Sequence, residues 1–477
     1  MVTILSALAA LALTAVHPQP LSSTPRRFSR YSDEQSISLA TAITRAKEND
    51  SELRFLRERY ALERFHLAEQ YRRVLPRVHL SYTHSDTVQY GGPDNRSRRL
   101  AFGVEQLLYD GGRTRRAFRI ARIDRELRRI TTEQRKRALK TEVTRAYLHV
   151  LGLARRVELS RQNLEIGLGQ LQVAEQEYLL GRMTNLSLTE VRLAVQEQEL
   201  AVRQLTVQHA AARRTLSRLI HAPGARESQE LKPRGSLDLG YTGSMSRDSL
   251  NRYVVEAARS SEGYEEHTAR IARALTQEQI ARRGVLPRLT ADGELSVSGR
   301  EFPLDEPAFS VGLRVELIPA YSGASLQSSA GSPRPETRSR TASLAVTPVE
   351  RLDRLYHTGQ ARNDRLRAEA EFARFDAATV DDISRQLGEI EALRDHAAVL
   401  RERIAAKRER MTVVSTQVEL GERPRLDVLR AVSELNELEN TLADLVVSLF
   451  ERELALMDAI GADGDPQIDA IVPEPVQ

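Results

Sequence analysis

The chain of 477 residues contains no cysteine, and aromatic residues make up only 5% of it. Without cysteine, the protein cannot form a disulfide framework, a thiolate zinc site, an iron–sulfur cluster, a cysteine nucleophile or a lipid-modified N-terminal cysteine. The scarcity of aromatic residues, combined with 29% charged residues, is typical of long amphipathic helices.

An excess of charge of one sign is also missing, because 70 Lys and Arg residues stand against 66 Asp and Glu residues. A net charge of only +4 gives little reason to expect a nucleic-acid partner. The segment 113–137 is rich in Arg, but acidic residues are interleaved with the cations. We interpret it as the solvated face of a long helix.

Long apolar runs are absent as well. No stretch reaches the ~18 apolar residues that a membrane-spanning helix needs, so a bundle of membrane helices is excluded. The longest apolar run, Val2 to Val16, has the length of the hydrophobic part of a secretory signal, with Ala12 and Ala15 near a plausible cleavage point. No Lys or Arg precedes it, which is atypical of such signals.

Patterns that carry chemistry are not found. The ten histidines are scattered without metal-ligand spacing, and the chain has neither a phosphate-binding glycine loop nor a nucleophile elbow. We therefore predict that the protein is not an enzyme and has no catalytic residue, no metal ligand and no cofactor.

The second half of the chain repeats the first. SLATAITRAKENDSELRF from Ser38 is matched by SLNRYVVEAARSSEGYEE from Ser249, and VLPRVHLSYTHS from Val74 by VLPRLTADGELS from Val285, both 211 residues apart. The later motif LYDGGR returns as LYHTGQ from Leu355, 247 residues on, which places an insertion before it. Duplication predicts two units with the same order of elements. The predicted divisions are a signal peptide and N-terminal segment (1–35), a first repeat (36–224), an equatorial linker (225–248), a second repeat (249–461) and a C-terminal tail (462–477).

Each repeat contains two segments in which apolar and polar residues alternate, as in a strand with one apolar and one polar face. Strands of this length suit a tilted outer-membrane barrel, although a soluble sheet with one core face fits the pattern equally well. We predict strands over 78–90, 98–109, 289–299 and 308–318. In a membrane barrel the lipid-facing positions would be Val78, Leu80, Tyr82, Leu100, Phe102, Val104, Leu295, Val297, Phe309, Val311, Leu313 and Val315.

Four strands cannot close a membrane barrel, and an open strand edge in lipid leaves backbone groups without hydrogen bonds. If these strands enter a membrane, several copies of the chain must share one barrel.

Amphipathic helices account for most of the remaining sequence. The segment 113–179 lacks proline and would be roughly 100 Å long as a helix, which implies a coiled-coil-like assembly. Gly181 and Gly421 are predicted to end the long helices, and Thr347 is predicted to cap the second one. Residues 319–346, rich in Ser, Gly, Pro and Arg, are interpreted as a flexible insertion. The predicted elements are long helices over 113–179 and 347–419, tip turns over 181–187 and 421–425, and returning helices over 187–221 and 425–460.

The duplicated order and the motifs VEQLLYDGG, YLLGRMTNLSLTEVRLA and LGERPRLDVLRAVSELNELENTLA resemble the TolC-like outer-membrane efflux proteins, over about Ser36 to Gly461. The resemblance implies a mixed α and β membrane protein of the outer membrane with a large periplasmic part. It implies a homotrimer in which each chain gives four antiparallel strands to a shared 12-stranded β-barrel, continued by an α-helical coiled-coil tunnel. The implied function is a passive exit duct of a tripartite efflux pump or a type I secretion system. The implied partners are a periplasmic adaptor (membrane fusion) protein, an inner-membrane pump and outer-membrane lipid.

By the same resemblance, the two glycine turns form the periplasmic tip, with the adaptor docking at Gly181, Thr184, Gly421 and Pro424. Family members with the best-known gate have a Gly-Thr-Arg-Thr sequence followed by two acids three residues apart.

At the corresponding positions of this chain, Arg423 takes the place of the latch arginine and Asp427 that of the first acid. Arg430 stands where the second acid is expected, and Thr189 and Glu190 take the place of the latch partners. The resemblance therefore implies a pore ring less cation-selective than a double acid ring.

Two other classes of protein remain open. A periplasmic adaptor also has a long helical hairpin, but it would carry one hairpin flanked by small β domains, whereas this chain has two hairpins, each preceded by a strand pair. A soluble coiled-coil scaffold or Arg-rich nucleic-acid binder would need no export signal and leaves the alternating strands unexplained.

Overall fold

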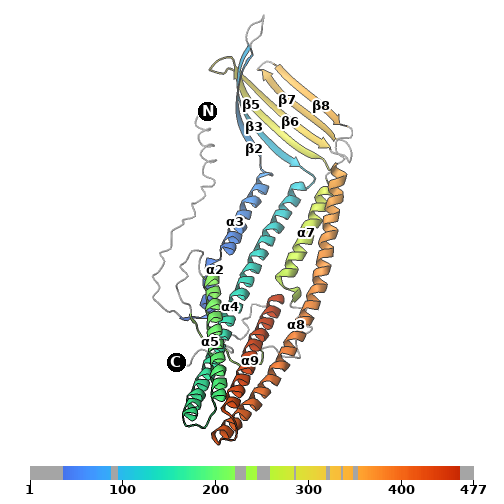
Figure 1. Cartoon of the computed structure of the whole chain (residues 1–477). Coiled ribbons are helices and arrows are strands. Elements are labelled where there is room, and N and C mark those ends of the chain that lie inside the picture. Colours follow the sequence, from blue (N-terminus) through green and yellow to red (C-terminus); the bar gives the residue numbers. More distant parts are fainter. Residues whose placement is uncertain are drawn as a thin grey trace.

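The computed structural model describes residues 36–87, 95–220, 232–243, 258–283, 286–317, 323–334, 337–347 and 353–461. These residues form an elongated body with a curved β-sheet at one end and long helices extending away from it (Figure 1). The predicted signal peptide (1–35), half of the predicted linker (225–231 and 244–248) and the predicted tail (462–477) lie outside the described residues.

Both repeats contribute strands to the sheet and a helical hairpin below it. The first repeat contains β1 (Ser36–Ile37), α2 (Leu39–Asn49), α3 (Ser51–Arg72), β2 (Arg77–Thr87), β3 (Asn95–Tyr109), α4 (Arg113–Leu179) and α5 (Asn185–Ile220). After β4 (Lys232–Pro233), the second repeat contains α7 (Glu262–Arg282), β5 (Arg288–Gly299), β6 (Glu306–Leu317), β7 (Gly323–Arg334), β8 (Thr337–Thr347), α8 (Asp353–Glu419) and α9 (Arg425–Ala459).

The sheet is larger than the sequence predicted. Its described strands follow the order β2-β3-β5-β6-β7-β8, and each neighbouring pair is antiparallel. The prediction of four strands per chain is therefore wrong. So is the interpretation of 319–346 as a flexible insertion, because this region forms the hairpin β7–β8. Its small Ser, Gly and Ala residues bury little apolar surface, but the backbone of β6 pairs with β7 from Ala324 to Ser332.

The predicted N-cap of the second long helix stays a prediction. Thr347 is the last residue of β8, where it pairs with Gly323, and α8 is described from Asp353 onward. Residues 348–352, which would hold the first turn after such a cap, lie outside the described residues.

Two helices of 67 residues, α4 and α8, run the length of the helical body. The core between the helices is divided into separate apolar clusters, as in a bundle that packs along a long axis. One cluster joins α2, α4 and α5, and another joins α4, α8 and α9, so α4 connects the two hairpins. None of the described helices combines the length and the apolar run needed to cross a bilayer.

Tyr147 fixes the crossing between the two repeats at the middle of α4. Strand β1 pairs in parallel with β4, and the buried Tyr147 hydroxyl lies 3.0 Å from the Ile37 carbonyl oxygen and 2.7 Å from that of Arg234. Burial raises the pKa of Tyr147 to about 12. The hydroxyl therefore stays protonated and can donate a hydrogen bond to this strand pair.

Glycine turns end both long helices. Gly181 has a φ of 71° and Gly421 a φ of 77°, a left-handed conformation that glycine adopts without a steric penalty. In each turn the next residue donates back across the helix end, from Arg182 to the Glu177 carbonyl and from Glu422 to the Gln417 carbonyl, both at 2.9 Å. These bonds form two Schellman motifs, so the hairpins reverse in the same way.

Candidate pore wall and periplasmic tip

In the six-stranded sheet, apolar side chains of one face are exposed and polar side chains of the other face are buried, which is the reverse of the pattern in a soluble protein. Leu80 is 64% exposed, Leu295 63% and Val311 62%. On the opposite face, Thr290 and Ser296 are buried, at 7% and 5% exposure. The residue register places all the predicted lipid-facing positions on the apolar face, because cross-strand partners share a face.

The polar face carries charge and small residues. Arg99 of β3 and Glu294 of β5 form an ion pair there with 2.5 Å between Nη2 and Oε1. Across from His79 stands Gly103, which leaves room for the imidazole. A sheet that is polar inside and apolar outside is the arrangement of a barrel wall in lipid, with water within.

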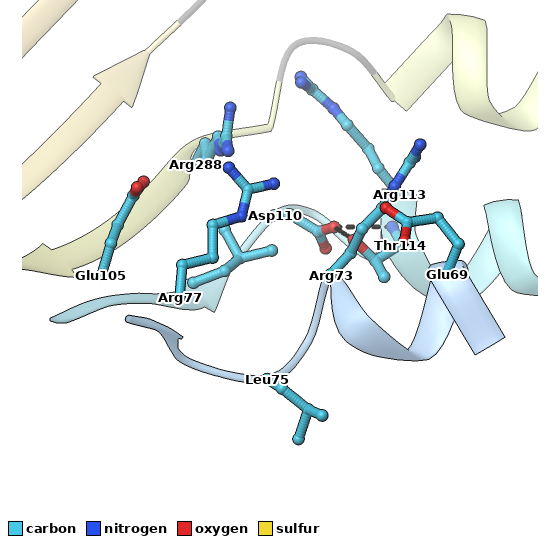
Figure 2. A pocket seen from close by; sticks show the side chains of 10 residues that line it. Glu69, Arg73, Leu75, Arg77, Glu105, Asp110, Arg113, Thr114 and Arg288 are labelled. Atoms are coloured by element: carbon cyan, nitrogen blue, oxygen red, sulfur yellow. Dashed lines mark hydrogen bonds between the residues drawn. The ribbon is translucent and has the colours of Figure 1, made fainter. Parts of the chain in front are cut away.

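A charged pocket marks the junction of the sheet and the helices (Figure 2). Its volume is about 360 Å³, and side chains of α3, β2, β3, α4 and β5 meet in it. The pocket combines acids with arginines: Glu69, Glu105 and Asp110 with Arg73, Arg77, Arg113 and Arg288. The three charged residues that the sheet contributes, Arg77, Glu105 and Arg288, lie on its polar face.

Asp110 in this pocket holds the start of α4. Its carboxylate accepts hydrogen bonds from the backbone N–H of Gly112 at 2.9 Å and of Thr114 at 2.7 Å, and from the Thr114 hydroxyl. Burial acts to raise the pKa of Asp110, but hydrogen bonds from Thr114 and Gly112 outweigh it and lower that pKa. The negative charge at the helix N-terminus aligns α4 beneath β3.

At the opposite end of the molecule, Arg425 joins the two helical hairpins. It is the first residue of α9, and its Nε and Nη2 atoms lie 2.9 and 2.6 Å from the two carboxylate oxygens of Glu177 on α4. Its Nη1 donates to Gln170 on the same helix at 3.0 Å. The hydrogen bond from Arg425 lowers the pKa of Glu177, and the same bond raises the pKa of Arg425.

Sequence reasoning placed Arg425 only at a helix boundary and missed this contact. A usable indication was present, because a cation in the first turn of a helix is disfavoured by the helix dipole and needs a compensating partner. The identity of the partner was not visible, since Glu177 lies 248 residues earlier in the chain.

Of the residues predicted as a gate, the structure brings together the three on the second hairpin. The Asp427 carboxylate lies between two arginines, with Arg423 Nη1 at 4.0 Å and Arg430 Nη1 at 3.9 Å. In the first hairpin, Glu190 is exposed, and the Thr189 hydroxyl donates to the Asn185 carbonyl at 2.8 Å. The roles of these five residues in a gate stay predictions.

The predicted docking residues lie on the two turns at the tip. The backbone N–H of Ser187 donates to Thr184 Oγ1 at 3.2 Å, which caps the first turn of α5. Pro424 stands in the corresponding place before α9 and offers no side-chain cap. Both turns are exposed, together with Gly181 and Gly421.

Above the tip, a polar groove separates the hairpins. Its volume is about 420 Å³, and α4, α5 and α9 supply its walls. Amide and hydroxyl side chains dominate the lining, among them Ser160, Asn163, Gln198, Asn436 and Asn440. Among the described residues, no group of three or more acidic or histidine side chains could hold a metal ion.

Comparisons with known proteins agree with this geometry. Residues 42–221 match the family described as outer membrane efflux protein. The whole fold is similar to CusC, with a TM-score of 0.73 and 13% identity over 94% of this chain and 98% of CusC. The chain thus resembles the outer membrane efflux proteins over residues 42–221, and its whole fold is that of solved outer-membrane efflux channels.

Two further solved channels show the same fold. VceC from Vibrio cholerae has a TM-score of 0.71 at 15% identity, over 89% of this chain and 96% of VceC. The open state of the Neisseria gonorrhoeae MtrE outer membrane channel has a TM-score of 0.70 at 15% identity, over 90% of both chains. A comparison with curated proteins gives no match.

The family match and the shared fold decide between the alternatives left by the sequence. The matched family is described as outer membrane efflux protein, and the chain lies in the outer membrane with a large periplasmic part. The adaptor and soluble-scaffold interpretations are therefore set aside.

Proposed function

We propose that this protein is the exit duct of a tripartite efflux pump or a type I secretion system. It conducts substrates passively from an inner-membrane transporter across the periplasm and the outer membrane. The observation that carries the proposal is the inverted sheet continued by helices of 67 residues, at roughly 100 Å each. The exposed apolar face of the sheet suits lipid, and the helices are long enough to extend deep into the periplasm.

The duct is a homotrimer. A single sheet with two open edges cannot stand in lipid, because each unpaired backbone group there costs several kcal/mol. Copies of the chain must therefore complete one barrel, and α4 and α8 of the copies would line one tunnel below it. The resemblance to trimeric family members supports three copies.

The periplasmic tip is the gate. Three copies would bring three Asp427 carboxylates into one ring, each flanked by Arg423 and Arg430. The arginines offset the acid charge, so the ring selects weakly for cations. Arg423 would close the tip through Thr189 and Glu190 of a neighbouring hairpin.

An adaptor protein docks at this end, joining the duct to the inner-membrane pump. The exposed turns at Gly181, Thr184, Gly421 and Pro424 offer the outermost contacts. The polar groove between the hairpins offers amide groups to a partner helix.

The native mass of the protein tests this function. We expect a membrane-embedded species of three chains when outer membranes are separated and extracted with detergent, and ion conductance when that species enters a planar bilayer. A protein that washes off the membrane as a soluble monomer or dimer would contradict the duct.

A further inference from the structure

The hairpin β7–β8 extends the sheet beyond the four strands of the duplicated pattern. β7 pairs with β6 from Phe309↔Ser332 to Leu317↔Ala324, and β8 pairs with β7 in turn. The free edge of β6, which a neighbouring copy would otherwise use, is therefore occupied by the chain itself. Within the described six-stranded sheet, β2 and β8 are the strands with an open edge (Figure 1).

The hairpin also continues the two faces of the sheet. The register aligns Val315 of β6 with Leu326 of β7, and Leu326 with Leu344 of β8, so the outward apolar row crosses onto the hairpin. Leu344 is 67% exposed and Val346 57%. On the other face, Arg314, Gln327 and Ser343 form a polar row.

A hairpin lying in water outside a barrel would gain nothing from an exposed apolar face, whereas a hairpin in lipid requires one. The apolar face of the hairpin also carries polar residues. Ser328 and Ser332 are small, and Arg340, opposite Ala330, is preceded on the same face by Arg338. Both arginines lie near the hairpin turn, where their long side chains can extend to the headgroup region.

The two open edges are complementary. Six antiparallel strands leave β2 and β8 pointing in opposite directions, so β2 of a second copy placed beside β8 continues the antiparallel order. Neither strand contains proline, which would interrupt such a ladder. Hydrocarbon tolerates no open strand edge, so both must be paired.

We propose that β8 of one copy pairs with β2 of the next, so that every copy gives six strands to the barrel. With the three copies of the proposed duct, on which this inference rests, six strands from each give eighteen in place of twelve. Because barrel diameter grows roughly in proportion to strand number, the membrane part is about 1.5-fold wider than a 12-stranded barrel.

The widening is confined to the membrane part. Between β6 and α8, the described residues add only the two strands of the hairpin and no helix. The tunnel therefore keeps the helices of the duplicated plan, and the tip still sets the narrowest passage.

Cysteine cross-linking tests the proposal directly, because the chain has no cysteine of its own. Ser81→Cys on the polar face of β2 is combined in turn with Ser339→Cys, Thr341→Cys and Ser343→Cys on the same face of β8. A matched pair of variants combines Ser81→Cys with Ser310→Cys or Arg314→Cys on β6. All substituted side chains lie on the polar face, and the native mass of each variant verifies assembly.

Oxidation in outer membranes should yield disulfide-linked dimers and trimers from at least one β8 combination and from neither β6 combination. Links from β6 without links from β8, in a trimer, would overturn the wider barrel and leave the exit duct intact, because β2 would then close a 12-stranded barrel against β6. A cysteine-free parent that washes off as a soluble monomer would overturn both. Assembled trimers in which no combination forms a link would also overturn the pairing of β8 with β2.

Discussion

Arg425 of α9 and Glu177 of α4 tie the two helical hairpins together at the tip, with 2.6 and 2.9 Å between the guanidinium nitrogens and the two carboxylate oxygens. The Arg425 side chain is 15% exposed and that of Glu177 30%, so the pair is partly shielded from water. Leu429, one helical turn further along α9, packs in an apolar cluster with Val191 of α5. An ion pair and an apolar contact therefore hold the hairpins together beside the proposed Asp427 ring.

Loss of the Arg425–Glu177 ion pair should favour an open tip. In Arg425→Gln, the bidentate ion pair is replaced by at most one hydrogen bond from an uncharged amide to the Glu177 carboxylate. The loss is about 1 kcal/mol, which shifts a closed–open equilibrium about five-fold toward open. Single-channel recordings in planar bilayers measure the open fraction. The control is Arg192→Gln, which removes an ion pair with Glu175 of 3.2 Å that lies within one hairpin. Equal open fractions in the two variants would contradict the prediction that Arg425 stabilises the closed tip.

The same pair predicts a dependence on pH. Because Arg425 lowers the pKa of Glu177, the stabilisation is fully present above the ordinary glutamate pKa and is lost as the pH falls through the lowered one. We expect the open fraction to rise when recordings move from neutral pH into this acidic range. In Glu177→Gln the rise attributable to this pair should be absent. An identical acid response in the parent and in Glu177→Gln would show that other groups control it.

Asp427 should set the weak ion selectivity of the duct. Asp427→Ala removes the ring acid and leaves Arg423 and Arg430, so the reversal potential in a salt gradient should move toward anion selectivity. Arg430→Asp should move it in the opposite direction, because it restores a second acid. Reversal potentials equal to the parent value in both variants would place Asp427 outside the pore.

The glycine turn of the second hairpin should be sensitive to substitution. Gly421→Ala places a side chain at a φ of 77°, where the left-handed conformation costs about 1–2 kcal/mol, and the thermal midpoint of the extracted protein should fall. Gly388→Ala is the control, since Gly388 lies inside α8 with open space around it. There alanine should stabilise by about 0.5–1 kcal/mol. A drop in both variants would mean that the turn conformation is not the cause.

Tyr147 should stabilise the crossing of the repeats through its hydroxyl group. Tyr147→Phe keeps the ring packed but removes the buried hydrogen bonding to the Ile37 and Arg234 carbonyls, at a cost of about 1–2 kcal/mol. Chemical unfolding measures this loss. Tyr356→Phe, at a side chain 69% exposed, should leave stability unchanged. Equal free energies of unfolding in the two variants would contradict a stabilising role for the Tyr147 hydroxyl.

The extent of the sheet was not predictable from composition. The Ser- and Gly-rich region that forms β7 and β8 has few large apolar residues, and its strand state depends on the ladder offered by β6. The interpretation as an insertion was wrong because strand pairing is a non-local interaction that a local pattern does not record.

By itself, the sequence determined the features that depend on near neighbours. Apolar spacing and glycine positions give long helices that end next to Gly181 and Gly421, and alternation assigns each strand residue to a face, because period and turn chemistry act over a few residues. Only the tertiary structure decided which strands form the edges of the sheet and which acidic residue pairs with Arg425. These contacts join segments far apart in the chain, and their geometry follows from how α4 and α9 pack and how β6 accepts β7.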